Sequence, residues 1–199
     1  MRFPLISALR IQLVFSNFYI GIAWGALDQA TAYTNKSTRA WPYGGDVSHL
    51  SCTLVAVDLT PPQNKEKATD EFYILSTYGN FFAHLRAATA LADKAGLEID
   101  ALYENSGDTE TRAKVTAEAR GEAAEWVASV KVTATDTGLR VTSGVFEVTG
   151  AKATAAKVGL DRYWRDIRTH TLHDPVAYKN RELGRYQLLK EIPEPTWYT

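Results

Sequence analysis

The chain has 199 residues, of which 45% are hydrophobic and 23% are charged, and 22 basic against 23 acidic residues leave a net charge of -1. These values exclude a disordered tail, a collagen-like repeat and a coiled-coil rod, and without a basic excess nucleic acid is not an expected partner. The length predicts one domain or at most two small ones.

The first predicted helix is long and buried, and it contains the apolar stretch over residues 11–27. Gln12, Ser16 and Asn17 interrupt this stretch and a polar helical continuation follows it, which favours a buried helix over a signal peptide or a membrane span. Apolar residues three to five apart indicate packing on more than one side. We expect this helix to end near Arg39.

Two more long helices follow in the pattern. The second is predicted to begin after Asp70 and to end at Gly96, and the third to begin with Asp108 or Thr109 as its cap and to run out at residues 137–138. The apolar face of the second consists of Phe72, Leu75, Tyr78, Phe82, Leu85, Ala88 and Ala92, and that of the third of Val115, Ala119, Ala123, Trp126 and Val130.

Shorter helices complete the C-terminal part. One is expected over residues 141–149, before Gly150, and Asp161 can cap the next. Asp174 followed by Pro175 is typical of an N-cap with proline at the first helical position, so residues 176–189 form the last helix. Few segments alternate with period two, and the predicted fold class is therefore all-α, most simply an antiparallel bundle of long helices with shorter C-terminal ones.

One segment, from Val47 to Gln63, does not fit this helical pattern, because it is apolar, β-branched and interrupted by two prolines. Codons for its Val-Ser, Asp-Leu-Thr and Gln can contain the donor, branch-point and acceptor signals of a short intron. We hypothesise a retained intron in the gene model, and the alternative is a genuine loop or short strand. Sequencing the transcript distinguishes the two.

Residues that could carry chemistry are densest between Leu160 and Lys179. This segment holds two of the four histidines, and His170 and His173 are three residues apart, so on a helix they share a face as a proton-relay or metal pair. No Glu-x-x-His pair accompanies them, and the single cysteine, Cys52, belongs to no zinc-like cluster, so no metal is predicted. A lone cysteine is also typical of a reducing, cytoplasmic compartment.

Each of these residues also has a purely structural reading. Asp174 can be an N-cap without any role in chemistry, and His173 can be a hydrogen-bonded histidine at a helix end. The arginines of the segment, Arg168 among them, can pair with nearby aspartates on a solvated face.

The run LDRYWRDIRTHTLHDPVAYKNRELGRYQL closely resembles the C-terminal helices of flavin monooxygenases with the acyl-CoA dehydrogenase fold, the dibenzothiophene monooxygenase or desulfurising group. FEVTGAKAT resembles a helix-to-loop passage of that family, and AYTNKSTRAWP resembles its segment ending in Thr-Arg-x-Trp. The resemblance covers nearly all of the chain except residues 47–63.

The resemblance implies that residues 1–199 form an acyl-CoA dehydrogenase-like C-terminal helical domain, with a four-helix up-down core, of a larger enzyme. Such enzymes receive reduced flavin from a separate flavin reductase, form a flavin hydroperoxide and oxygenate a small sulfur or nitrogen compound. It further implies FMN in preference to FAD as the cofactor, a homotetramer, a cytoplasmic location and no membrane association.

The resemblance also assigns roles to residues. His173 falls where the related dehydrogenases have a loop with a catalytic glutamate, and His170 would orient it or relay its proton. Arg39 matches the position whose guanidinium holds a flavin phosphate, often across a subunit boundary, and Arg168 and Lys179 are weaker candidates for the same anion.

Two alternatives stay open beside the monooxygenase. An acyl-CoA dehydrogenase would be supported by a glutamate in the loop of His173 and Asp174, and the loop has none. A helical module that serves only in oligomerisation would need no flavin chemistry at all.

Overall fold

The computed structural model describes residues 4–41, 67–104, 115–196 and 198. This part of the chain is helical and contains no strand. Its elements are α1 (Pro4–Ser37), η2 (Ala68–Asp70), α2 (Phe72–Glu104), α3 (Ala117–Thr149), η4 (Ala151–Thr154), α4 (Asp161–Thr171) and α5 (Val176–Leu189).

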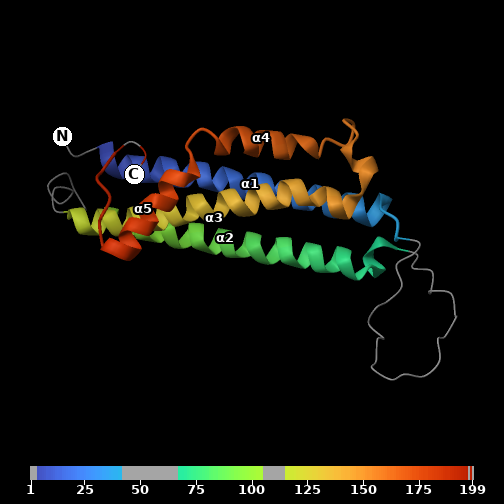
Figure 1. The fold of residues 1–199 in the computed structure, drawn as a ribbon, viewed down its shortest axis with the longest axis horizontal. Coiled ribbons are helices and arrows are strands. Elements are labelled where there is room, and N and C mark those ends of the chain that lie inside the picture. The colour runs from blue at the N-terminus through green and yellow to red at the C-terminus, as the bar shows by residue number, and fades with distance from the viewer. Residues whose placement is uncertain (1–3, 42–66, 105–114, 197, 199) are drawn as a thin grey trace, which may run out of the picture.

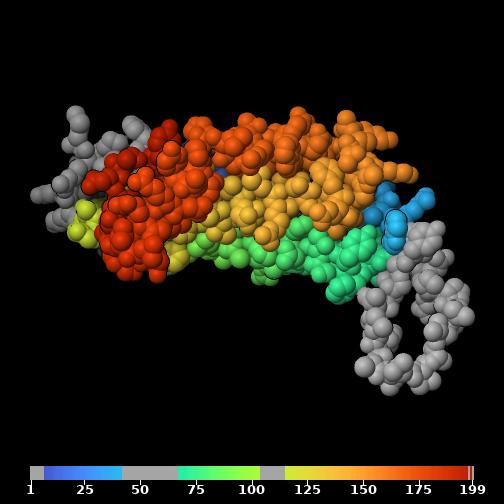
Figure 2. All heavy atoms as spheres, in the orientation of Figure 1, coloured from blue at the N-terminus to red at the C-terminus, as the bar shows by residue number. Residues whose placement is uncertain are grey.

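Helices α1, α2, α3 and α4 lie lengthwise beside one another and alternate in direction along the chain (Figure 1). The shorter α5 packs across α3, and together with the C-terminal residues it covers one end of the long helices (Figure 2). Helix α3 contacts all four other α-helices and is the centre of the bundle. The predicted all-α fold with a four-helix up-down core is therefore confirmed.

Small and β-branched residues form the core where α1, α2 and α3 meet. Alanines recur on the buried faces of all three helices and let the backbones approach closely, while larger side chains fill the space between them. Tyr19, Ile99, Val127, Val130 and Ile167 belong to the largest buried cluster. Ile167 brings α4 into this core and so fixes the helix that carries His170 and ends just before His173.

The predicted end of the second helix at Gly96 is wrong, because α2 continues to Glu104. Ala95 and Ile99 are buried on either side of the glycine, and their packing outweighs the roughly 1 kcal/mol that a glycine costs in a helix interior. The predicted apolar face is also wrong at its beginning, since Phe72, Leu75 and Phe82 are exposed and Ile74 and Phe81 are buried instead.

The predicted third and fourth helices are one helix, α3, which runs through Gly138 without a break. A Cβ atom at this position would overlap the side chain of Ile167, so the glycine allows α4 to lie close to α3. The Thr116 hydroxyl caps α3 by accepting the Ala119 N–H over 3.1 Å, and the predicted caps Asp108 and Thr109 lie outside the described residues. The helix ends before Gly150, as predicted, with a φ of 82° at that glycine.

The two C-terminal helices form where they were predicted, but without the predicted caps. Asp161 is the first residue of α4 and pairs with Arg165 at 3.1 Å, and α5 begins after Pro175 without a side-chain cap. The carboxylate of Asp174 is turned into the bundle, because a buried lysine attracts it. The segment from Val47 to Gln63 lies outside the described residues, so its origin stays a hypothesis.

None of the described helices combines the length and apolar character that crossing a bilayer requires. The described residues also contain no group of three or more histidine, cysteine, aspartate or glutamate side chains that could hold a metal ion.

Candidate functional site

The structure brings the two predicted histidines together at the C-terminal end of α4. The ring of His170 is half-buried against α1, with its centroid 5.0 Å from that of Phe15 and 5.9 Å from that of Phe18. His173 is exposed and lies 5.9 Å from Phe15, and the two imidazoles are 6.5 Å apart. Both therefore stand over one aromatic surface of α1, on which the Phe18 side chain is 48% exposed.

Hydrogen bonds to one carbonyl fix the turn between the histidines. The carbonyl oxygen of His170 accepts the backbone N–H of His173 over 3.2 Å and the hydroxyl of Tyr19 over 3.3 Å. The same hydroxyl lies 3.4 Å from His170 Nδ1. Because Tyr19 is fully buried, this anchor is rigid, and it ties the position of the turn to α1.

A buried lysine lies behind Tyr19, and the sequence did not reveal it as part of the site. The Nζ atom of Lys131, on α3, donates to the Tyr19 hydroxyl over 2.8 Å and lies 3.9 Å from Asp174 Oδ2. Burial lowers the pKa of Lys131, which Asp174 opposes, and burial together with the charge of Asp174 raises the pKa of Tyr19 to about 12. The tyrosine is therefore a phenol with a hydrogen to donate.

The helical period could have identified Lys131, because it lies in the row of buried residues that includes Val127 and Ala134. A lysine in such a row must find a partner inside the protein. Its partners Tyr19 and Asp174 are distant in sequence, so only the fold shows them. Asp174 is accordingly a counter-ion inside the bundle and not the predicted helix cap.

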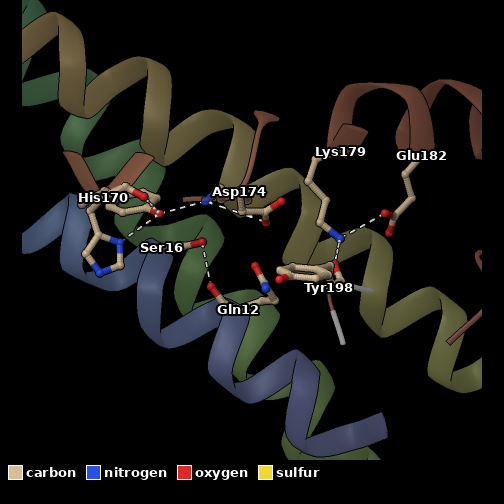
Figure 3. A network of polar contacts seen from close by, with 9 residues as sticks. Gln12, Ser16, His170, Asp174, Lys179, Glu182 and Tyr198 are labelled. Atoms are coloured by element: carbon tan, nitrogen blue, oxygen red, sulfur yellow. Dashed lines mark hydrogen bonds and ion pairs between the residues drawn. The ribbon is translucent and has the colours of Figure 1, made fainter. Parts of the chain in front are cut away.

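A second buried polar cluster lies beside the first, where α5 crosses α3 (Figure 3). The ammonium of Lys179, whose side chain is almost completely enclosed, donates to Glu182 over 3.0 Å and to the backbone carbonyl of Tyr198. To bind a flavin phosphate, Lys179 would have to exchange these partners. Among the predicted phosphate ligands, Lys179 is therefore the one whose surroundings agree least with that role.

Glu125 joins this cluster from α3 and is 6% exposed. Burial first, and then the negative charge of Glu182, raises its pKa to about 7. Since this value lies above the usual 4.5, the folded chain holds the proton more tightly than the unfolded chain does. The resulting stabilisation is complete below pH 4.5 and is lost as the pH rises to 7.

Glu125→Gln removes this titration and should raise the free energy of unfolding at pH 8 by about 1–3 kcal/mol, with no gain at pH 4. Urea denaturation at the two pH values measures the difference. Glu147→Gln, on the exposed face of the same helix, is the matched control and should change little at either pH. An equal effect of Glu125→Gln at both pH values would contradict the assignment.

The structure does not bring the predicted phosphate ligand Arg39 to the histidines within one chain. Arg39 is exposed just beyond α1, and roughly 27 Å of helix, at about 1.5 Å per residue, separate Tyr19 from Ser37. The backbone N–H of Trp41 donates to Glu71 over 2.9 Å, which ties this end of α1 to the start of α2. Arg168 is exposed on α4, two residues before His170.

Comparison with known families gives one matching model, the acyl-CoA dehydrogenase C-terminal domain, over residues 53–177. The matched part includes Arg168, His170 and His173.

Three relatives illustrate the similarity. A dibenzothiophene monooxygenase of Mycolicibacterium goodii is 40% identical over 93% of this chain and 39% of its own length, and the probable FMNH2-dependent monooxygenase SfnC of Pseudomonas putida is 34% identical over 99% and 44%. The crystal structure of TdsC from Paenibacillus sp. A11-2 with FMN and indole superposes with a TM-score of 0.80 and 37% identity, over 98% of this chain and 43% of that one. The chain thus spans about two fifths of the length of these relatives.

Proposed function

The chain belongs to the family of acyl-CoA dehydrogenase C-terminal domains, and we propose that it is the C-terminal helical part of a flavin-dependent monooxygenase that oxygenates a sulfur or nitrogen compound. The observation that carries this proposal is the pair of histidines held over an exposed aromatic surface of α1. The names of the relatives, dibenzothiophene monooxygenase and FMNH2-dependent monooxygenase, support it.

The described residues fit a flavin in two separate places. The rings of Phe15, Phe18 and His170, which are inclined to one another, offer an aromatic surface for an isoalloxazine ring, and the exposed guanidinium of Arg39 offers planar donors for phosphate oxygens. A bound reduced flavin would supply the activation of oxygen. FMN is the proposed form, since TdsC was crystallised with FMN and SfnC is named after FMNH2.

The two histidines are the groups at this surface that can accept and donate protons. His173 is exposed and able to exchange a proton with a bound substrate, and His170 is held by its ring contacts and hydrogen bonds. We propose His173 as the acid-base residue and His170 as its neighbour in proton transfer, with Arg168 as a nearby positive charge.

The separation of Arg39 from the histidines supports an assembly in which Arg39 of one copy serves the flavin of another. We propose a homotetramer, in the cytoplasm, that receives reduced flavin from a separate reductase and acts on a small-molecule substrate. Exposed apolar side chains at the start of α2, Phe72, Leu75 and Phe82, are available as part of such an interface.

Acyl-CoA dehydrogenation is the second enzymatic reading, and the geometry disfavours it. The only carboxylate in the turn after His173 is Asp174, which is buried and directed at Lys131, so it cannot reach a substrate as a base. A module with a role in oligomerisation alone would not need the buried hydrogen bonds that fix the histidine turn.

The test is flavin binding by this chain extended at its N-terminus with the corresponding part of the Mycolicibacterium goodii relative. We expect it to bind FMN more tightly than FAD, and Arg39→Ala to weaken FMN binding about ten- to a hundredfold, because charge-assisted phosphate contacts are lost. Titration followed by flavin fluorescence measures both, and oxygenation should recover when FMN is raised.

Arg140→Ala is the matched control, since Arg140 is an exposed arginine paired only loosely, at 3.6 Å, with Asp136 on its own helix. If Arg39→Ala binds FMN as tightly as the parent, the assignment of Arg39 is wrong. If the extended chain binds neither flavin, the proposed function is wrong.

A further inference from the structure

The hydrogen bonds at the Tyr19 hydroxyl can be counted atom by atom. The ammonium of Lys131 has only hydrogens to give, so it donates to the Tyr19 oxygen over 2.8 Å. The single hydroxyl hydrogen is donated to the carbonyl of His170, 3.3 Å away. The remaining contact, 3.4 Å from His170 Nδ1 to the hydroxyl oxygen, is then a hydrogen bond only if Nδ1 carries the hydrogen.

We propose that Lys131 and Tyr19 are positioning residues that hold His170 as its Nδ1–H tautomer and leave the lone pair on Nε2. In a histidine, the hydrogen bond made by one ring nitrogen decides the state of the other. Nε2 is thus the atom of His170 able to accept a proton. The use of His170 in catalysis rests on the proposed function, whereas its tautomer does not.

Lys131 is needed because an ammonium group cannot accept the hydrogen of the Tyr19 hydroxyl, which is then donated elsewhere. A neutral acceptor in the place of Lys131 could take that hydrogen, and the His170 carbonyl would then lose the Tyr19 hydroxyl as a donor. Asp174 Oδ2 lies 3.9 Å from the ammonium and the Tyr19 ring centroid 4.8 Å from it, and both contacts favour the charged lysine in an otherwise buried position. Lys131 therefore donates to the Tyr19 oxygen, and the Tyr19 hydroxyl donates to the His170 carbonyl.

The test is the tautomer of His170 in the 199-residue chain, labelled with ¹⁵N-histidine and measured at pH 8.5, about two units above the usual histidine pKa. Long-range ¹H–¹⁵N spectra distinguish a ring nitrogen that carries hydrogen from one that does not, and His170→Asn assigns the signals. We expect an Nδ1–H signal in the parent. Tyr19→Phe keeps the ring in the core and removes the hydroxyl, so it should shift the tautomer ratio about two- to tenfold toward Nε2–H.

Tyr163→Phe is the matched control, because Tyr163 also lies between α4 and α1, packed over Gly25, two turns before His170. It should leave the His170 signals unchanged. The neutral pair Lys131→Met with Asp174→Asn should shift the ratio in the same direction as Tyr19→Phe, and it should add nothing when Tyr19→Phe is already present.

An Nε2–H signal for His170 in the parent, or a ratio that Tyr19→Phe does not change, would overturn the proposal. If the Lys131 and Asp174 pair variant does not fold, the Tyr19→Phe comparison decides alone. The measurement needs neither flavin nor substrate, so a failure here is distinct from a failure to bind FMN.

Discussion

His173→Ala, in the chain extended with the N-terminal part of a relative, should lower the rate of substrate oxygenation about 100-fold and leave FMN affinity nearly unchanged. Loss of a general acid-base group removes proton transfer, whereas the proposed flavin surface consists of Phe15, Phe18 and His170. The rate of product formation at saturating FMN measures the effect, and the ratio of product formed to oxygen consumed shows whether oxygen use stays coupled to oxygenation.

His84→Ala is the control for His173→Ala. His84 lies on α2, whereas His170 and His173 lie at the end of α4, and His84 Nδ1 is hydrogen-bonded to the carbonyl of Asn80 in the preceding turn. Its replacement should leave oxygenation within about twofold of the parent. A His173→Ala variant that couples oxygen use to product as well as the parent does would show that His173 is only a structural histidine.

Lys131→Met should lower the free energy of unfolding by about 3–5 kcal/mol. The substitution leaves the buried carboxylate of Asp174 without its cation, and it removes the donor to the Tyr19 hydroxyl. Urea denaturation at pH 7 measures the loss. Lys94→Met, at an exposed lysine paired with Glu98 in the next turn, should cost less than about 0.5 kcal/mol.

A second substitution separates the lost ion pair from lost packing. Asp174→Asn added to Lys131→Met should recover most of the stability, because no uncompensated charge is then buried. If the double variant is no more stable than Lys131→Met, the lysine contributes through packing of its aliphatic chain and not through Asp174.

The long helices and their fold class followed from apolar periodicity, because burial on one side of a helix leaves a repeat that local sequence retains. The helix ends predicted at Gly96 and near Gly138 were wrong, because buried neighbours keep α2 helical past Gly96 and Ile167 of α4 packs against α3 at Gly138. The spacing of three predicted that His170 and His173 lie close together, and their rings are 6.5 Å apart, although His173 follows the end of α4 and does not share a helix face with His170.

The buried part of the site, Tyr19 and Lys131, could not be predicted from the sequence for a different reason. These residues are 112 positions apart, and nothing local in α1 or α3 indicates that they meet. The same holds for Asp174, whose neighbour Pro175 made a helix cap the natural reading. Long-range electrostatic partners are properties of the packed bundle.

The close approach of α3 and α4 at Gly138 links this glycine to the position of the two histidines. Ile167, which occupies the space beside that glycine, lies one helical turn before His170 on α4. A displacement of Ile167 would therefore displace this end of α4. A side chain at position 138 would push Ile167 away and tilt α4. Both imidazoles would then move together across the aromatic surface. A substitution at position 138 can therefore move the histidines without changing any residue that contacts them.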